Sequence, residues 1–336
     1  MSSKTTPKEG GPRPTGESGP DAGLLVAYAD AGRLAAPEVA PGIVLLGVHR
    51  GGLRPAEIPP RFDMLLTTDP DPPRPWVGVA AGAIDQGVAE LQAAVAATPV
   101  AAAVAAQVLR TSADLSWDAA LVVESLAFSM LLGGAEFRAW RARTPIRPRG
   151  SDGRRLELSR EAGVLSLTLA RAEARNAVDA RMRDQLVEAL EFALVDPEAG
   201  PVVLRAEGPA FSAGGDLNEF GEATDPAFAH AIRLQQAPVR LARALGGRLT
   251  ARLHGACIGA GIELPAAAAR VVAAPDAWFR LPEVGMGLIP GAGGTVSIPR
   301  RIGRHRACFM AVSGRDIDVA TALAWGLVDA VEPGAP

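Results

Sequence analysis

The sequence is poor in the residues that form disulfide scaffolds, membrane spans and secretion signals. Only two cysteines occur, Cys257 and Cys308, both in apolar or helical surroundings, so a disulfide framework is excluded and a reducing compartment is favoured. Apolar runs stop short of the roughly 18 residues that a transmembrane helix needs. The N-terminus lacks the basic start and apolar block of a signal peptide. These absences predict a cytoplasmic protein without a membrane partner.

The sequence also lacks a large excess of positive or negative charge. The formal net charge is −3, and no long basic stripe appears, so extensive contact with nucleic acid is not expected. Residues 23–68 carry no phosphate-loop or dinucleotide fingerprint. We expect neither a metal site nor a bound cofactor. Hydrophobic residues make up 48% of the chain, which is enough for a sizeable core.

Composition divides the chain into four parts. Residues 1–22 are rich in Ser, Thr, Pro, Gly and charge, which predicts a disordered tail. Residues 23–146 begin with short apolar runs that indicate buried strands and continue with alanine-rich helices. A Pro/Arg/Gly stretch at 147–154 is typical of a linker. Residues 155–336 form the fourth part.

The N-terminal helices have recognisable ends. Pro99 suits a helix first turn, and Asp114 or Ser116 can cap the helix that ends at Gly133. Glu124 lies in an apolar stretch of that helix, and we interpret it as an acid at the edge of the core with a local partner.

In the fourth part strands and helices alternate. Runs at 156–158 and 164–169 predict a hairpin, Asp179 can cap the helix that follows, and 201–206 and 248–253 read as strands. A helix is expected over about 225–245. This alternation predicts a layered α/β fold with right-handed crossovers. Four arginines between 300 and 306 are typical of a solvated face.

Two glycine-rich turns could bind an anion through the backbone. FSAGGD (211–216) directly follows a strand, and GAGIE (259–263) follows a strand and opens a helix. Small residues allow backbone amides to approach a ligand, and amides at a helix start are unpaired. One amide from each turn could form an oxyanion hole, although either turn by itself is more often a simple tight turn.

Glu263 and Glu283 lie twenty residues apart among small and apolar residues. A carboxylate in such surroundings costs free energy unless it is paired, solvated or used in chemistry. We interpret both as functional, the alternative being two acids at a helix start and in a loop. Gly291–Gly294, in PGAGG, is expected to start a helix that packs near the substrate pocket.

Four motifs together resemble the enoyl-CoA hydratase/isomerase (crotonase) superfamily: AFSAGGDLNEF, HGACIGAGIEL, FRLPEVGMGLIPGAGGT and SGRDIDVATALAWGLVDAVEP. Their order and spacing agree over about residues 156–333, so the resemblance implies a crotonase-like spiral core of ββα units in 155–336. It also implies an acyl-CoA thioester as substrate, no separate cofactor, and a homo-oligomer that is a trimer or hexamer.

The resemblance carries residue roles onto this sequence. The amides of Gly215 and Ala260 would polarise the thioester carbonyl, with glycine where the family often has alanine and alanine where it often has glycine. Glu263 would activate water, and Glu283 would protonate the α-carbon. The remaining expected contacts fall into two groups. Those to CoA are Arg175, Ala177, Ala213, Asp216, Leu217 and Gly259, although Asp216 can instead order its own loop. Those to the acyl chain are Met286, Ile289 and Pro290, with plain packing in the core as the alternative for Met286 and Ile289.

The chain departs from the family in its helices. Family members continue past the GLVDAVEP strand into helices that complete the site, whereas this sequence stops at Pro336. Residues 98–144 have a similar helical texture, so we expect them to supply those helices in a permuted arrangement. An unrelated N-terminal helical domain is the alternative.

The expected reaction is hydration of a 2-enoyl-CoA to a 3-hydroxyacyl-CoA. Isomerisation, ring-opening or C–C cleavage, thioester hydrolysis and cofactor-free oxygenation remain open, as does a catalytically quiet subunit that binds acyl-CoA.

Overall fold

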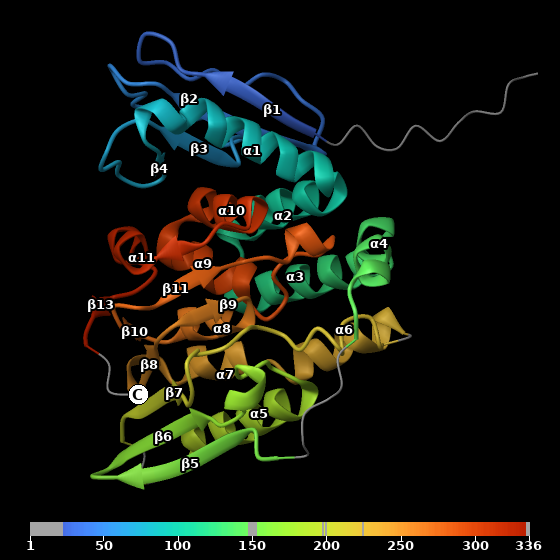
Figure 1. Ribbon diagram of the computed structural model, residues 1–336, viewed down its shortest axis with the longest axis vertical. Helices are drawn as coiled ribbons and strands as arrows, with labels where there is room; N and C mark the ends of the chain where they lie inside the picture. Colours follow the sequence, from blue (N-terminus) through green and yellow to red (C-terminus); the bar gives the residue numbers. More distant parts are fainter. Residues whose placement is uncertain (1–22, 147–152, 197, 199, 224, 334–336) are drawn as a thin grey trace, which may run out of the picture.

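The computed structural model describes residues 23–146, 153–196, 198, 200–223 and 225–333. The expected tail at 1–22 and residues 147–152 of the expected linker lie outside the described residues. Two sheet-containing halves are joined by helices that run through the middle of the molecule (Figure 1).

The N-terminal part opens with a four-stranded parallel sheet in the order β1-β2-β3-β4. The strands are β1 (Gly23–Tyr28), β2 (Ile43–His49), β3 (Met64–Thr67) and β4 (Val77–Gly78). Every residue of β3 is buried, and so is nearly all of β2. Continuous apolar runs of this kind are typical of parallel strands covered on both faces.

Four helices follow: α1 (Ile84–Ala97), α2 (Pro99–Thr111), α3 (Trp117–Leu132) and α4 (Ala135–Arg143). Pro99 begins α2, as expected, because a helix's first N–H has no intrahelical partner to lose. Of the two candidate caps for α3 the structure selects Ser116, whose hydroxyl accepts the amide of Ala119. Eight of the thirteen residues of α2 are buried, so this helix lies inside the molecule.

The second half is built on a six-stranded sheet in the order β13-β10-β8-β7-β6-β5. Its strands are β5 (Leu156–Glu161), β6 (Val164–Leu169), β7 (Val202–Ala206), β8 (Leu249–Leu253), β10 (Arg270–Ala273) and β13 (Ala330–Val331). The β5–β6 pair is the expected antiparallel hairpin, and the other neighbours are parallel. A smaller sheet, β12-β11-β9, contains β9 (Ala256–Ile258), β11 (Trp278–Arg280) and β12 (Ile317–Asp318).

The helices of this half are α5 (Ala180–Val195), α6 (Pro226–Gln235), α7 (Pro238–Ala244), α8 (Ala260–Glu263), α9 (Gly294–Ile302), α10 (Arg304–Ser313) and α11 (Val319–Trp325). Asp179 caps α5 by accepting the amide of Met182, as expected. The single helix expected over 225–245 is wrong. It is divided into α6 and α7 because Pro238 has no N–H to continue the first helix and instead begins the second.

Segments from the two ends of the chain lie side by side in the middle layer (Figure 1). Helix α2 packs on α10, and α3 packs on α9 and α6. The arginines of α9 and α10 take part in this contact: Arg304 donates to the carbonyl of Phe62, and Arg306 donates to that of Trp76. The expected solvated basic face is therefore wrong at these two positions, because their guanidinium groups bind carbonyls of the N-terminal part.

In the described part of the chain, no single helix is long and apolar enough to cross a membrane. Two bent pairs, Ala81–Ala97 with Pro99–Asp114 and Trp117–Leu132 with Ala135–Arg143, reach that length and composition only when joined. Among the same residues no three His, Cys, Asp or Glu side chains are grouped as a metal site would require.

Candidate active site

A cavity of about 430 Å³ brings the expected catalytic residues together. Its lining includes Gly215, Ala260, Glu263 and Glu283, which come from three separate segments of the second half. Glu124 of α3 also lines it, so the N-terminal part supplies one wall. The lining continues along α3 and α6.

Strand pairing explains why the two expected acids meet. Strands β9 and β11 are parallel neighbours, with Ile258 opposite Arg280, so the residues that follow each strand emerge at the same edge. Gly259 lies between the two carboxyl groups: a methyl placed on it would collide with Oε1 of Glu283 and lie 3.7 Å from Oε1 of Glu263. Its φ of +50° is a second reason for glycine at this point.

The turn before α9 holds Glu263 by two backbone hydrogen bonds. The amides of Ala292 and Gly294 donate to its Oε2 at 2.7 and 2.8 Å. The intervening amides of Gly293 and Thr295 donate to Glu124, each at 2.8 Å. Two carboxylates therefore bind alternate amides of one turn, at a helix start where donors are unpaired.

Burial changes the acid strength of all three glutamates. It raises the pKa of Glu124 to about 7 and that of Glu283 to about 8, and it raises the pKa of Glu263 well above its ordinary value. The charge of Glu124 adds to the rise in both other residues. Glu263 has two N–H donors that favour its ionised form, whereas Oε2 of Glu283 has no hydrogen-bond partner among the described residues. These hydrogen bonds stabilise the ionised form of Glu263, and they oppose the rise in its pKa that burial and the charges of Glu283 and Glu124 cause.

Two backbone donors face the same cavity. Neither the amide of Gly215 nor that of Ala260 donates to any partner within the described residues. Ala260 is the first residue of α8, where a helix leaves its N–H free. Such a pair of amides can bind one carbonyl oxygen from two directions.

The loop that carries Gly215 is fixed on both sides. The hydroxyl of Ser212 donates to the carbonyl of Asn176 at 2.7 Å and accepts the amide of Gly214 at 3.1 Å. Asp216 binds the guanidinium of Arg171 at 2.9 Å and accepts the amide of Asn218 at 3.0 Å. Asp216 thus orders its own loop while also lining the cavity.

Other expected contacts lie outside this lining. Arg175 is exposed, with a left-handed φ of +51°. Ala177, Ala213 and Gly259 belong to the turns that surround the cavity, and Leu217 is 39% exposed with its carbonyl bound by Arg141.

The expected acyl contacts Met286, Ile289 and Pro290 are not among the residues that line the cavity, and their role stays a prediction. Ile289 is completely buried in the hydrophobic core. Side chains of α3 and α6, among them Phe128 and Ile232, line the cavity instead.

Glu124 is the residue that the sequence did not reveal as part of the site. Its expected local partner is wrong: its partners are Gly293 and Thr295, 169 and 171 residues away in the chain. The sequence shows only an acidic residue inside an apolar helix. It does not show which distant segment donates hydrogen bonds to that residue.

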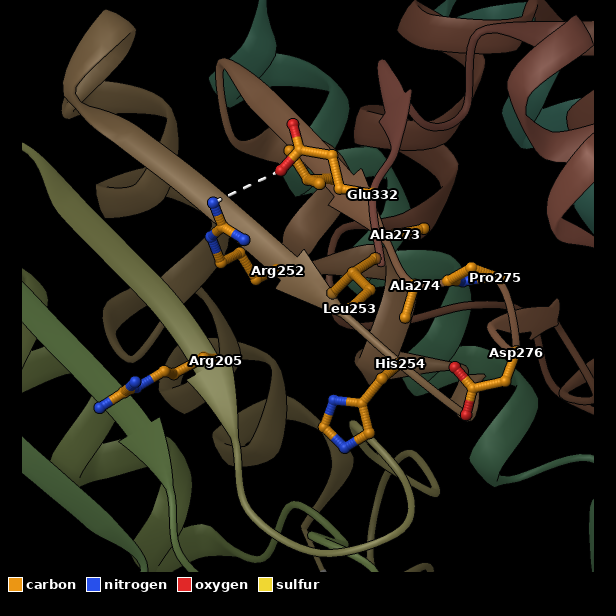
Figure 2. A pocket seen from close by; sticks show the side chains of 10 residues that line it. Arg205, Arg252, Leu253, His254, Ala273, Ala274, Pro275, Asp276 and Glu332 are labelled. Carbon is orange, nitrogen blue, oxygen red and sulfur yellow. Dashed lines mark ion pairs between the residues drawn. The ribbon is translucent and has the colours of Figure 1, made fainter. Parts of the chain in front are cut away.

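A second hollow, of about 330 Å³, lies beyond the ends of β8 and β10 (Figure 2). Charges of both signs line it and partly satisfy one another: Arg252 pairs with Glu332 at 3.5 Å, and the ring of His254 binds the carbonyl of Gly208. The described residues that line this hollow include no adjacent pair of glutamates beside unpaired backbone amides, as the first cavity does. We therefore assign the chemistry to the first cavity.

Comparison with known proteins agrees with this geometry. The family model described as enoyl-CoA hydratase/isomerase matches residues 159–335. The chain belongs to this family. A 2,3-dehydroadipyl-CoA hydratase from Escherichia coli is 40% identical over 178 residues, covering 53% of this chain and 69% of the relative. An enoyl-CoA isomerase/hydratase from Mycosarcoma maydis is 33% identical, covering 51% of this chain and 66% of the relative.

Solved structures give the same fold. The enoyl-CoA hydratase from Thermoplasma volcanium matches with a TM-score of 0.50 and 32% identity, over 54% of this chain and 72% of that one. The expected α/β crotonase-like fold is confirmed for the family-matched part. The chain spans about two thirds of the length of the curated relatives it matches.

Proposed function

We propose that this protein hydrates a 2-enoyl-CoA to a 3-hydroxyacyl-CoA. The observation that carries the proposal is the meeting of Glu263 and Glu283 at Gly259, in one cavity with the free amides of Gly215 and Ala260. Related proteins named as hydratases support it.

The two amides would bind the thioester oxygen. As water adds to the β-carbon, negative charge develops on this oxygen in an enolate-like transition state. A preorganised donor of this kind contributes about 3–4 kcal/mol. Donors that have no partner within the protein need no rearrangement to take up the charge.

The two carboxyl groups would divide the proton transfers. Glu263, ionised and held by the turn at 292–295, accepts a proton from the attacking water. Glu283, kept protonated by its buried setting, donates a proton to the α-carbon. After turnover the two groups must exchange their protonation states, for which their closeness around Gly259 provides a short path.

The nucleotide end of CoA would lie along the turns outside the cavity. Arg175 is exposed there and free to meet a phosphate, while Ala177, Ala213, Asp216 and Leu217 would line its approach. Gly259 would border the thioester.

Helices α2–α4 would take the place of the helices that follow the last strand in other family members. The direct bonds from Glu124 to the turn at 292–295 support this permuted arrangement. By the same resemblance we propose a homo-oligomer, which light scattering coupled to gel filtration would test.

A screen of short, medium, branched and aromatic 2-enoyl-CoAs tests the proposed reaction. Hydration removes the absorbance of the conjugated thioester and adds the mass of one water. Loss of conjugation without added water would identify an isomerase, and release of free CoA would identify a thioester hydrolase. If no enoyl-CoA is consumed while acyl-CoA still binds, the protein is a binding subunit and the hydratase proposal fails.

A further inference from the structure

The cavity wall made by α3 and α6 contains an arginine whose charge the site does not use. Arg233 of α6 lines the cavity and reaches across to α3. Its Nε donates to the hydroxyl of Ser125 at 3.2 Å, its Nη2 donates to that of Ser129, and its Cζ lies 4.7 Å from the ring centre of Phe128. These contacts hold the guanidinium in one orientation.

No carboxylate balances this cation directly. Among the residues that the structure describes, Arg233 forms no ion pair, and its Nη1 group donates to no partner. Burial lowers its pKa to about 10, attraction from Glu124 opposes that change, and repulsion from Arg183 adds to it. Arg233 is half-buried, and a cation that is withdrawn from water without a paired anion costs free energy.

Three of the acids that line the cavity, Glu124, Asp216 and Glu219, already have other partners. Both oxygens of Glu124 accept amides of the turn at 292–295. Asp216 binds Arg171, and Glu219 accepts the amide of Ala180. Two neutral hydroxyls would suffice to fasten α6 to α3, so structural need alone does not explain a guanidinium that still has unused donors.

We infer that the site takes an acyl chain carrying a carboxylate at the end remote from the thioester, with Arg233 as its binding partner. This inference rests on the proposed function. A carboxylate would accept from the unused donors of Arg233 in a charge-assisted pair.

The position of Arg233 favours an anion on the acyl chain over a phosphate of CoA. Ser125, which it binds, is the neighbour in sequence of Glu124, and Glu124 shares the turn that holds Glu263. The guanidinium therefore belongs to the wall beside the reacting groups. Exposed Arg175, in contrast, lies outside the cavity, where phosphates can remain in water.

The test compares two 2-enoyl-CoAs of equal chain length, one ending in a carboxylate and one in a methyl group. We expect the wild-type protein to favour the carboxylate substrate by about tenfold to a hundredfold in kcat/KM, mainly through KM. Arg233→Met should abolish this preference by lowering kcat/KM far more for the carboxylate substrate than for the methyl substrate, while Arg233→Lys should keep part of the preference. Arg240→Met, which removes an exposed arginine of α7, is the matched control and should change neither rate.

Equal rates for both substrates in the wild type would overturn the inference and leave the hydratase proposal intact. A similar loss for both substrates in Arg233→Met would also overturn it, since the guanidinium would then serve a CoA phosphate or the fold. If neither substrate reacts, the hydratase proposal fails, and calorimetry with the corresponding saturated acyl-CoAs decides the inference. Tighter binding of the carboxylate form by about tenfold, lost in Arg233→Met, would support it, and equal affinity would overturn it.

Discussion

Glu124 and Glu263 bind alternate amides of a single turn, although one comes from the first half of the chain and the other from the second. Each carboxylate takes two amides, so the turn cannot shift toward one without losing bonds to the other. The position of Glu263 therefore depends on a helix outside the family-matched segment.

Glu124→Gln should loosen this turn. The new amide group places N–H donors opposite an N–H of Gly293 or Thr295, which should cost about 1–3 kcal/mol of unfolding free energy. Because the charge of Glu124 raises the pKa of Glu263 and Glu283, its removal should also move the pH–rate profile to lower pH. Arg233, the nearby cation, lowers the pKa of Glu124 and so favours the charged form whose effect is removed. Kinetics across pH and thermal unfolding measure both effects.

The matched control is Glu136→Gln. Glu136 likewise accepts two amides, those of Val100 and Ala101 at the start of α2, but it does not line the cavity. It should lose stability without moving the pH–rate profile. An unchanged profile in Glu124→Gln would mean that Glu124 only braces the fold.

Glu283→Gln should remove the proton donor and leave the fold intact, since Oε2 of Glu283 has no hydrogen-bond partner in the described part of the chain. General acid–base catalysis contributes about 10²–10⁴-fold, so kcat for hydration should fall within that range. Affinity for a saturated acyl-CoA should stay the same. Hydration at the wild-type rate would remove Glu283 from the mechanism.

Glu263→Gln should damage both chemistry and structure. It removes the base and sets an N–H against the amide of Ala292 or Gly294, so a loss of about 10²–10⁴-fold in kcat should accompany a lower melting temperature. Comparing the two glutamine variants by circular dichroism and kinetics separates the roles. A Glu263 variant as stable as the Glu283 variant would contradict the importance of the turn at 292–295.

The free energy of unfolding should decrease as pH rises, because the pKa of Glu283 is raised in the folded protein. Its pKa in the folded protein is raised to about 8, so between the pKa of the unfolded chain and that value the folded state binds the extra proton. Unfolding free energy then decreases as pH rises through this window, by at most about 1.4 kcal/mol per pH unit. Glu283→Gln should reduce the decline between about pH 5 and 8. Urea unfolding at several pH values measures it, and parallel slopes in both proteins would refute the assignment.

Gly259→Ala should disable the site through geometry. The residue has a φ of +50°, and a methyl group there collides with Glu283. We expect at least 1 kcal/mol of destabilisation and a large loss of activity. Gly285→Ala is the control, because nothing lies within 4 Å of a methyl at that exposed position. Comparable activity in the two variants would argue against a close approach of Gly259 to the acids.

The sequence predicted much of the second half because its signals are local. The caps, the hairpin and the two glycine-rich turns each depend on neighbouring residues, and strand alternation indicated the α/β class. Pro238 was a local signal that was overlooked. The acyl wall could not be read in this way, since α3 and α6 meet through side chains more than a hundred residues apart, such as Ser125 and His230. Glu124 was missed for the same reason.

The interleaving of α2 and α3 with α9 and α10 limits how far this enzyme can be divided. A fragment cut at the family boundary would lack Glu124, leave the amides of Gly293 and Thr295 unsatisfied and uncover the apolar surfaces on which α2 and α3 pack. During synthesis α2 and α3 cannot pack on α9 and α10 until most of the chain has been made. The family-matched segment therefore should not fold stably alone, and we expect the described chain to fold as one unit.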